Sequence, residues 1–166
     1  MNELHKAYLN LGSNIQPEIN LVKAIQSLSK CGEVREVSNA WESLAVGTPA
    51  PNYLNACVLF LSVLNKFDLK KIIRLIEARL GRLRSGDKYI PRTIDIDIIL
   101  FDDQIQKDSF WNDAFVIIPL AEIYTEYQNP LTRQSLTEIS MQLRGKVWMQ
   151  ARPEVLSQFR GNPSPL

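Results

Sequence analysis

Apolar and polar positions alternate at the start of the chain and then change to a helical period. Residues 7–11 alternate between the two classes and stop at Gly12, which predicts a first strand that ends in a turn. Pro17 suits the first position of a helix, and the apolar side chains of residues 17–30 recur every three or four residues up to Gly32. We therefore predict an amphipathic helix with one buried face.

Two strands are expected next. Residues 33–46 have the composition of a strand, and residues 53–63 form a longer one that is rich in β-branched and aromatic side chains. Residues 47–51 between them contain two prolines, which cannot maintain a hydrogen-bonded ladder. This segment is therefore a loop.

A second helix and a fourth strand complete the pattern. Residues 69–80 carry an apolar stripe at helical spacing, with Asp68 as the expected N-cap and Gly81 at the end. Residues 82–91 hold Gly, Ser, Asp and several cations, which indicates an exposed loop. Residues 95–101 then alternate as a clear strand.

The order strand, helix, strand, strand, helix, strand predicts an α+β fold with a ferredoxin-like βαββαβ core, in which helices pack on one face of an antiparallel sheet. A C-terminal extension follows, with a polar connection (102–113), an apolar run (115–120) and a helix near 133–143. We expect residues 1–166 to form a single domain. The tail, about residues 156–166, is expected to be poorly ordered.

Composition narrows the class of protein. The 166 residues include 19 Lys+Arg and 18 Asp+Glu, a net charge of +1 that excludes a strongly basic nucleic-acid coat. Cys31 and Cys57 have neither zinc-site spacing nor a disulfide framework, so buried thiols in a reducing compartment are expected. The longest apolar stretch, residues 56–61, is far shorter than the ~20 residues of a membrane helix. We expect a cytoplasmic protein that binds neither membrane nor nucleic acid, as a monomer or weak dimer.

Two opposed charge blocks adjoin each other within this neutral total. Residues 70–92 contain eight cations and two acids, a net charge of +6, and residues 93–113 contain six Asp and one Lys, a net charge of −5. A polyphosphate that carries divalent cations, such as Mg-ATP, requires cations for its oxygens and carboxylates for its metal. The plainer alternative is a solvated helix face beside an acidic loop.

The spacing of Asp95 and Asp97 favours the first interpretation. Residues i and i+2 of a strand project from one face about 6–7 Å apart, so the two carboxylates can converge on a metal while Ile94, Ile96 and Ile98 face the core. A carboxylate pair among isoleucines needs a partner, and a cation supplies one. Many isolated DxD pairs are nevertheless simple surface pairs.

Tyr53 and Asn55 share the same spacing at the start of their strand. On one face, an aromatic ring and an amide can stack on and hydrogen-bond a flat heterocycle. Taken alone, such a pair is more often an ordinary feature of a core edge, and the same holds for Phe115.

The segment Pro91-Arg-Thr-Ile-Asp-Ile-Asp-Ile-Ile-Leu-Phe101 resembles the signature of the 6-hydroxymethyl-7,8-dihydropterin pyrophosphokinases of the folate pathway. Leu9-Asn-Leu-Gly-Ser-Asn14, Tyr53-Leu-Asn-Ala56, Arg82 and Phe115-Val-Ile-Ile-Pro-Leu120 follow the family's order and spacing. The resemblance covers most of residues 7 to 125. It implies the ferredoxin-like fold and transfer of diphosphate from ATP to the pterin hydroxymethyl group, with release of AMP.

The resemblance also implies roles for individual residues. Two magnesium ions would be held by Asp95 and Asp97, and Arg82 and Arg92 would contact the phosphates during transfer, beneath a lid formed by residues 82–92. The nucleotide positions it implies are Arg74, Glu77, Arg82, Arg84, Arg92 and Ile98. The pterin positions it implies are Ser43, Leu44, Tyr53, Asn55, Tyr89 and Phe115, with the ring between Tyr53 and Phe115.

Two departures from the family pattern lie in residues 102–113. The usual His and the Arg shortly after it are missing, and Asp113 stands at the expected Arg position. This predicts weaker ATP binding or recruitment of Lys107 in their place.

The sequence leaves two other functions open. One is a degenerate paralogue that binds pterin without turnover, which the departures suggest. The other is a non-catalytic ferredoxin-like module for RNA or a small ligand, although residues 53–60 lack the basic and aromatic run of an RNA-binding strand.

Overall fold

The computed structural model describes residues 3–45, 47, 49–87 and 89–161. Its elements are β1 (His5–Ser13), α1 (Pro17–Leu28), β2 (Glu33–Val37), β3 (Ala40–Ser43), β4 (Tyr53–Ser62), α2 (Lys66–Arg79), β5 (Asp95–Phe101), β6 (Gln104–Ile105), η1 (Asp108–Asn112), α3 (Ala114–Ile123), α4 (Leu136–Arg144), β7 (Met149–Arg152) and η2 (Ser157–Phe159). The predicted βαββαβ core is confirmed.

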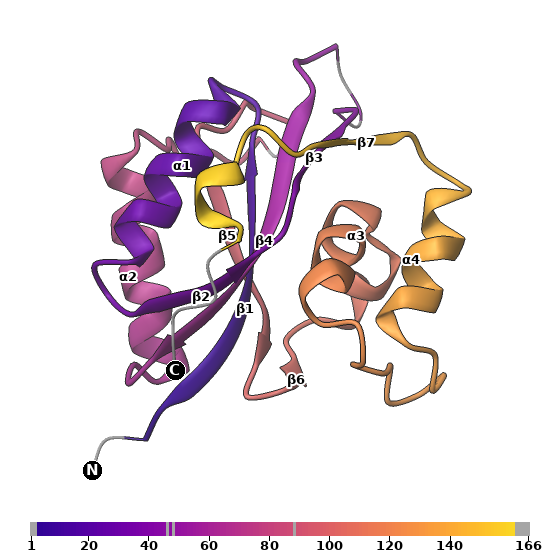
Figure 1. Ribbon diagram of the computed structural model, residues 1–166. Helices are drawn as coiled ribbons and strands as arrows, with labels where there is room; N and C mark the ends of the chain where they lie inside the picture. Colours follow the sequence, from indigo (N-terminus) through magenta and orange to yellow (C-terminus); the bar gives the residue numbers. More distant parts are fainter. Residues whose placement is uncertain (1–2, 46, 48, 88, 162–166) are drawn as a thin grey trace.

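All strand pairs are antiparallel, in the order β6-β5-β1-β4-β3-β7, and β2 pairs with the far end of β4. The helices α1 and α2 cover one face of this sheet, as expected for the core. The extension places α3 and α4 on the opposite face and then returns along β7 (Figure 1). The prediction of helices on one face therefore holds only for the βαββαβ part.

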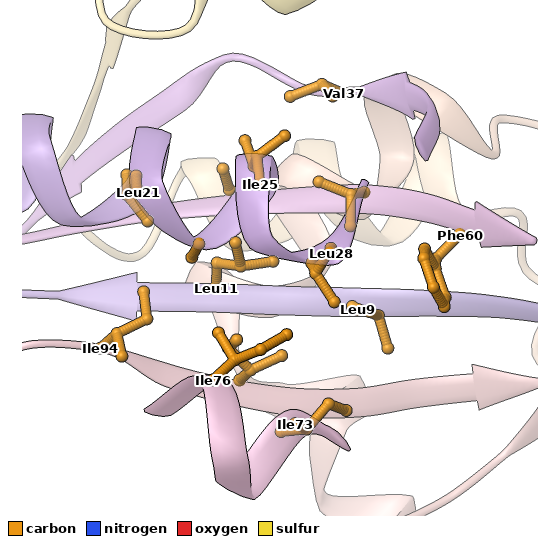
Figure 2. Packing of buried hydrophobic residues seen from close by; sticks show 14 of the residues in the cluster. Leu9, Leu11, Leu21, Ile25, Leu28, Val37, Phe60, Ile73, Ile76 and Ile94 are labelled. Atoms are coloured by element: carbon orange, nitrogen blue, oxygen red, sulfur yellow. The ribbon is translucent and has the colours of Figure 1, made fainter. Parts of the chain in front are cut away.

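The core under α1 and α2 forms because alternate residues of the central strands point to that face. Leu9 and Leu11 of β1 are fully buried against Leu21 and Ile25 of α1 (Figure 2). Truncating such a side chain to alanine costs about 2–5 kcal/mol. A second cluster, built around Tyr8, Ile99, Ile117 and Leu120, fills the other face.

Several boundaries differ from the prediction. The strand expected over 33–46 is two strands, because Ser38 turns inward and Asn39 is held by Glu122 of α3: Cys57 N donates to Ser38 Oγ (2.8 Å), and Asn39 N donates to Glu122 Oε2 (2.7 Å). The expected end of that strand, Val46, lies outside the described residues, as does Lys88.

Three further details were predicted wrongly. Helix α2 begins at Lys66 because Asn65 is its N-cap and accepts from Asp68 N (3.0 Å), so Asp68 is not the cap. Cys31 is exposed, and only Cys57 is buried. The helix expected near 133–143 begins at Leu136, where Ser135 and Glu138 form a capping box.

The tail expected over 156–166 is described only to residue 161. In that part Leu156 is fully buried, and Phe159 packs against the cluster under α1. Among the described residues, no helix is both long enough and apolar enough to cross a membrane.

Candidate active site

A cavity of about 490 Å³ opens between α2, β5, the loop after α2 and the segment before α3. It is lined by Lys70, Ile73, Arg74, Glu77, Arg82, Arg84, Arg92, Asp95, Ile96, Asp97, Ile98, Gln106, Lys107 and Phe110. All six predicted nucleotide positions and both predicted metal ligands are in this set. The two opposed charge blocks therefore meet in space, which makes a solvated helix face an inadequate explanation of the pattern.

Glu77 is a buried carboxylate that holds two of the arginines that line the cavity. Its carboxylate, 3% exposed, accepts from Arg82 Nη1 (2.6 Å), Arg84 Nη2 (2.6 Å) and the backbone N–H of Ile96 (2.9 Å). Burial raises the pKa of this carboxyl, while the Ile96 N–H and the guanidinium groups favour its charged form. Glu77 thus joins α2 to β5 and fixes the position of two arginines.

Asp95 and Asp97 lie on the same face of β5, as predicted, with Ile94, Ile96 and Ile98 in the core. Their surroundings differ. The carboxylate of Asp95 accepts hydrogen bonds from both Arg82 and Arg92. The Asp97 carboxylate forms no hydrogen bond or ion pair among the described residues, and its pKa is raised by burial and by the charge of Asp95, against the opposing effect of Lys107.

Strand register extends this face across the sheet. Asn55 of β4 is opposite Gly12 of β1, which is opposite Asp95 of β5. We call this line of three residues the first row. A Cβ at Gly12 would lie 2.9 Å from Asn55 Oδ1, so glycine keeps the space between the amide and the carboxylate open.

A second row lies two residues further along the strands. Cys57 of β4 is opposite Asn10 of β1, which is opposite Asp97 of β5. Cys57 is fully buried, and burial raises the pKa of its thiol. Neither Gly12 nor Asn10 was predicted as a site residue, because only the observed register shows what each one faces.

The predicted pterin residues gather at the Asn55 end of the first row. Asn55 Nδ2 donates to Ser43 Oγ (3.0 Å), and Tyr53 is opposite Ser43 in the register. Burial raises the pKa of Tyr53, which keeps its hydroxyl protonated. The structure thus brings Ser43, Tyr53 and Asn55 together, and their roles as ligand contacts stay predictions.

The other three pterin residues are on exposed segments. Leu44 follows β3, Phe115 is in the first turn of α3, and Tyr89 is in the loop between α2 and β5. All three side chains are exposed. Tyr89 covers Gly47, where a Cβ would lie 2.6 Å from its ring. The 82–92 loop therefore already touches the loop that follows β3.

The two departures from the family pattern have different places in the structure. Asp113 precedes α3 and is not among the cavity residues, so the expected charge reversal beside the phosphates is not where the described cavity lies. Lys107 does line the cavity, beside Phe110. The sequence prediction missed Lys70, Gln106 and Phe110, because an isolated Lys or Gln gives no signal of the space that it faces.

The donor set fits a hard divalent cation. Asp95 and Asp97 offer carboxylate oxygens on one face, and the fully buried Oδ1 of Asn10 in the adjacent strand has no hydrogen-bond partner in the described part of the chain. That same part contains no group of three or more His, Cys, Asp or Glu side chains suited to a metal. Further ligands of a bound ion must come from neutral groups, water or the substrate.

Comparison with known proteins gives consistent matches. A family model described as 7,8-dihydro-6-hydroxymethylpterin-pyrophosphokinase matches residues 8–125. A 2-amino-4-hydroxy-6-hydroxymethyldihydropteridine pyrophosphokinase of Synechocystis sp. is 32% identical over 152 residues, covering 85% of this chain and 77% of the relative. The Bacillus subtilis protein of that name is 31% identical over 156 residues, covering 87% and 90%.

Solved structures agree on the fold. The crystal structure of Plasmodium falciparum HPPK-DHPS wild type with pterin and p-hydroxybenzoate matches with a TM-score of 0.70 and 12% identity, covering 99% of this chain and 46% of that one. This chain therefore spans about half the length of that solved chain. At this identity the likeness concerns the architecture.

Proposed function

Because the chain belongs to the 7,8-dihydro-6-hydroxymethylpterin-pyrophosphokinase family, we propose that the cavity beside β5 holds ATP with magnesium and that the first row leads from it to the pterin. The activity is transfer of diphosphate from ATP to the hydroxymethyl group of the dihydropterin in folate biosynthesis. The observation that carries the placement is the register Asn55, Gly12, Asp95, which lines up an amide, an open space and a carboxylate on one face.

Magnesium, two ions with ATP, would be held by Asp95 and Asp97, where it would neutralise phosphate charge and polarise the attacked phosphorus. Residues of the chain supply the rest. Arg82 and Arg92 move from Asp95 to the phosphates, because a guanidinium group binds phosphate oxygens as readily as a carboxylate. Glu77 keeps Arg82 at the base of the cavity during this exchange.

At the other end of the row, Asn55 and Ser43 hydrogen-bond the edge of the pterin, and Tyr53 and Phe115 enclose its ring. The hydroxymethyl oxygen then attacks the β-phosphorus in line and gives up its proton, which is released to solvent with the products. The bond from the β-phosphorus to the oxygen that bridges it to the α-phosphorus breaks, and AMP leaves with that oxygen. Tyr89 and the 82–92 loop close over the reactants and exclude water.

The degenerate-paralogue alternative is disfavoured because both carboxylates and both arginines meet in one cavity. We further propose that the protein acts as a monomer or weak dimer, without nucleic-acid or membrane partners.

A coupled assay of AMP release from ATP and 6-hydroxymethyl-dihydropterin tests the proposal. We expect magnesium-dependent activity that falls about 10³-fold or more in Asp97→Ala, because metal-ligand contributions amount to several kcal/mol. Asp102→Ala, beyond the end of β5, is the matched control and should retain activity. Failure of the wild type to bind α,β-methylene-ATP at millimolar concentration with magnesium, measured by calorimetry, would refute the proposal.

A further inference from the structure

Asn10 is a polar side chain at the centre of the sheet whose carbonyl oxygen, Oδ1, is left without a hydrogen-bond partner among the described residues. It is 5% exposed and lies between Leu9 and Leu11, which are fully buried on the opposite face. Its Oδ1 is buried without a partner, and its amide makes no hydrogen bond among the described residues. Such a group lowers stability relative to an apolar side chain of the same size. Its presence therefore calls for an explanation other than packing.

The register limits what the amide can meet. Asn10 is opposite Cys57 on one side and Asp97 on the other. Directly opposed residues share a face, with Cβ atoms about 4.5–5.5 Å apart. The buried Cys57 thiol is a weak partner, so the group on the flanking strands best able to share a ligand with Asn10 is the Asp97 carboxylate.

Asn10 Oδ1 and an ionised Asp97 are both acceptors, so the carboxylate cannot satisfy that oxygen, and the Nδ2 of Asn10, which could donate, makes no hydrogen bond to Asp97 among the described residues. A protonated Asp97 that donates directly to Asn10 Oδ1 is excluded as well, because no hydrogen bond joins these two side chains. Asn10 Oδ1 and the Asp97 carboxylate can both be satisfied by a bound ligand that is positively charged or donates hydrogen bonds. A divalent cation with its bound water has both properties, since Mg²⁺ keeps several waters when carboxylates hold it.

We propose that Asn10 is a positioning residue of the metal site: its Oδ1 accepts a hydrogen bond from water bound to the divalent cation held by Asp95 and Asp97. The inference rests on the proposed function and adds a group that acts through metal-bound water. It also explains why the central strand retains an unsatisfied amide. Partners in this outer position typically change metal affinity by about 10–100-fold.

The test compares Asn10→Leu with the wild type in two measurements, using the full chain. Binding of Mn²⁺ in the presence of α,β-methylene-ATP, followed by electron paramagnetic resonance, should weaken about 10–100-fold. The Tm without metal and nucleotide should rise by about 2–8 °C, because an unsatisfied buried amide has been replaced by an apolar side chain of similar size. Asn10→Asp keeps an acceptor in place and should retain Mn²⁺ affinity.

Asn20→Leu is the matched control. Asn20 is also buried, but its Nδ2 donates to Ile15 O (2.6 Å), so its replacement should lower the Tm and leave Mn²⁺ affinity unchanged. Unchanged Mn²⁺ affinity in Asn10→Leu would overturn the inference whichever way the Tm moved. A wild type that binds no Mn²⁺ with the nucleotide would overturn the metal site itself, and with it this role of Asn10.

Discussion

The two rows that cross the site face differ in how completely the protein satisfies them. In the first row Asn55 donates to Ser43, Asp95 accepts from two arginines, and Gly12 leaves open space. In the second row Cys57 and Asn10 are buried and Asp97 is half-buried, and the side chains of Asn10 and Asp97 have no hydrogen-bond partner among the described residues. The two rows are only two residues apart on the same strands. The polar groups of the first row have partners within the protein, and those of the second row lack them until a ligand binds.

The two rows are expected to contribute to the stability of the free protein with opposite signs. Groups that hold arginines can be satisfied before the substrate arrives, because the guanidinium later moves to phosphate. Asp95 is satisfied in this way by Arg82 and Arg92, whereas the side chains of Asn10 and Asp97 have no such exchangeable partner among the described residues. The second row is therefore expected to lower the stability of the free protein, and the first row is expected to raise it.

The largest expected effect on stability comes from the support of the first row. Glu77→Ala leaves the mostly buried Arg82 without one of its two carboxylates and the Ile96 N–H without its acceptor. We expect a loss of about 3–5 kcal/mol in the free energy of unfolding, the cost of removing one partner of a buried ion pair. Urea denaturation followed by circular dichroism measures it. The exposed Glu126→Ala is the control, expected to change stability by less than about 0.5 kcal/mol.

Most of the fold could be predicted because it depends on local periodicity. Strand β5 has its predicted bounds, and α1 begins at the predicted proline. The break between β2 and β3 could not be predicted, since it depends on Glu122, which is 83 residues away from Asn39 in the chain. The apolar run that contains Phe115 proved to be helical even though Pro119 lies inside it.

The site was predictable only in part for a related reason. The i, i+2 spacing of Asp95 and Asp97 predicts within one strand that their carboxylates share a face. The roles of Arg82 and Arg92 came from the family resemblance. Asn10 and Gly12 acquire meaning only from the strands paired beside them, which the pattern along one strand does not specify. Lys70 faces the cavity only because of the rotation of α2.

A smaller effect should follow from closing the open space of the first row. In Gly12→Ala the new Cβ would be 2.9 Å from Asn55 Oδ1, so the amide must move and its hydrogen bond to Ser43 is strained. We expect pterin affinity to fall about 10–100-fold, in line with a cost of about 1–3 kcal/mol for overpacking. Calorimetric titration with the pterin measures the change. Gly145→Ala, where a Cβ would be at an ordinary 3.5 Å from Gln142 O, should bind pterin normally; equal affinity in both variants would remove the role given to Gly12.

The smallest effect has the opposite sign and belongs to the second row. Burial and the charge of Asp95 raise the pKa of Asp97, so the folded protein keeps this proton to a higher pH than the unfolded chain does. Stability therefore falls as pH rises from the ordinary Asp value through the folded value. Asp97→Asn cannot ionise and should escape this loss.

At pH 7, without metal, Asp97→Asn is expected to unfold about 2–4 °C above the wild type, the shift that about 1 kcal/mol produces in a chain of this size. At pH 4, near the ordinary pKa of an aspartate, the two Tm values should converge. With magnesium and α,β-methylene-ATP the order should reverse, because only the wild type gains binding free energy from the cation. Differential scanning calorimetry under the three conditions decides the matter. A variant less stable than the wild type at pH 7 without ligands would show that the second row already supports the fold, and the contrast between the rows would disappear.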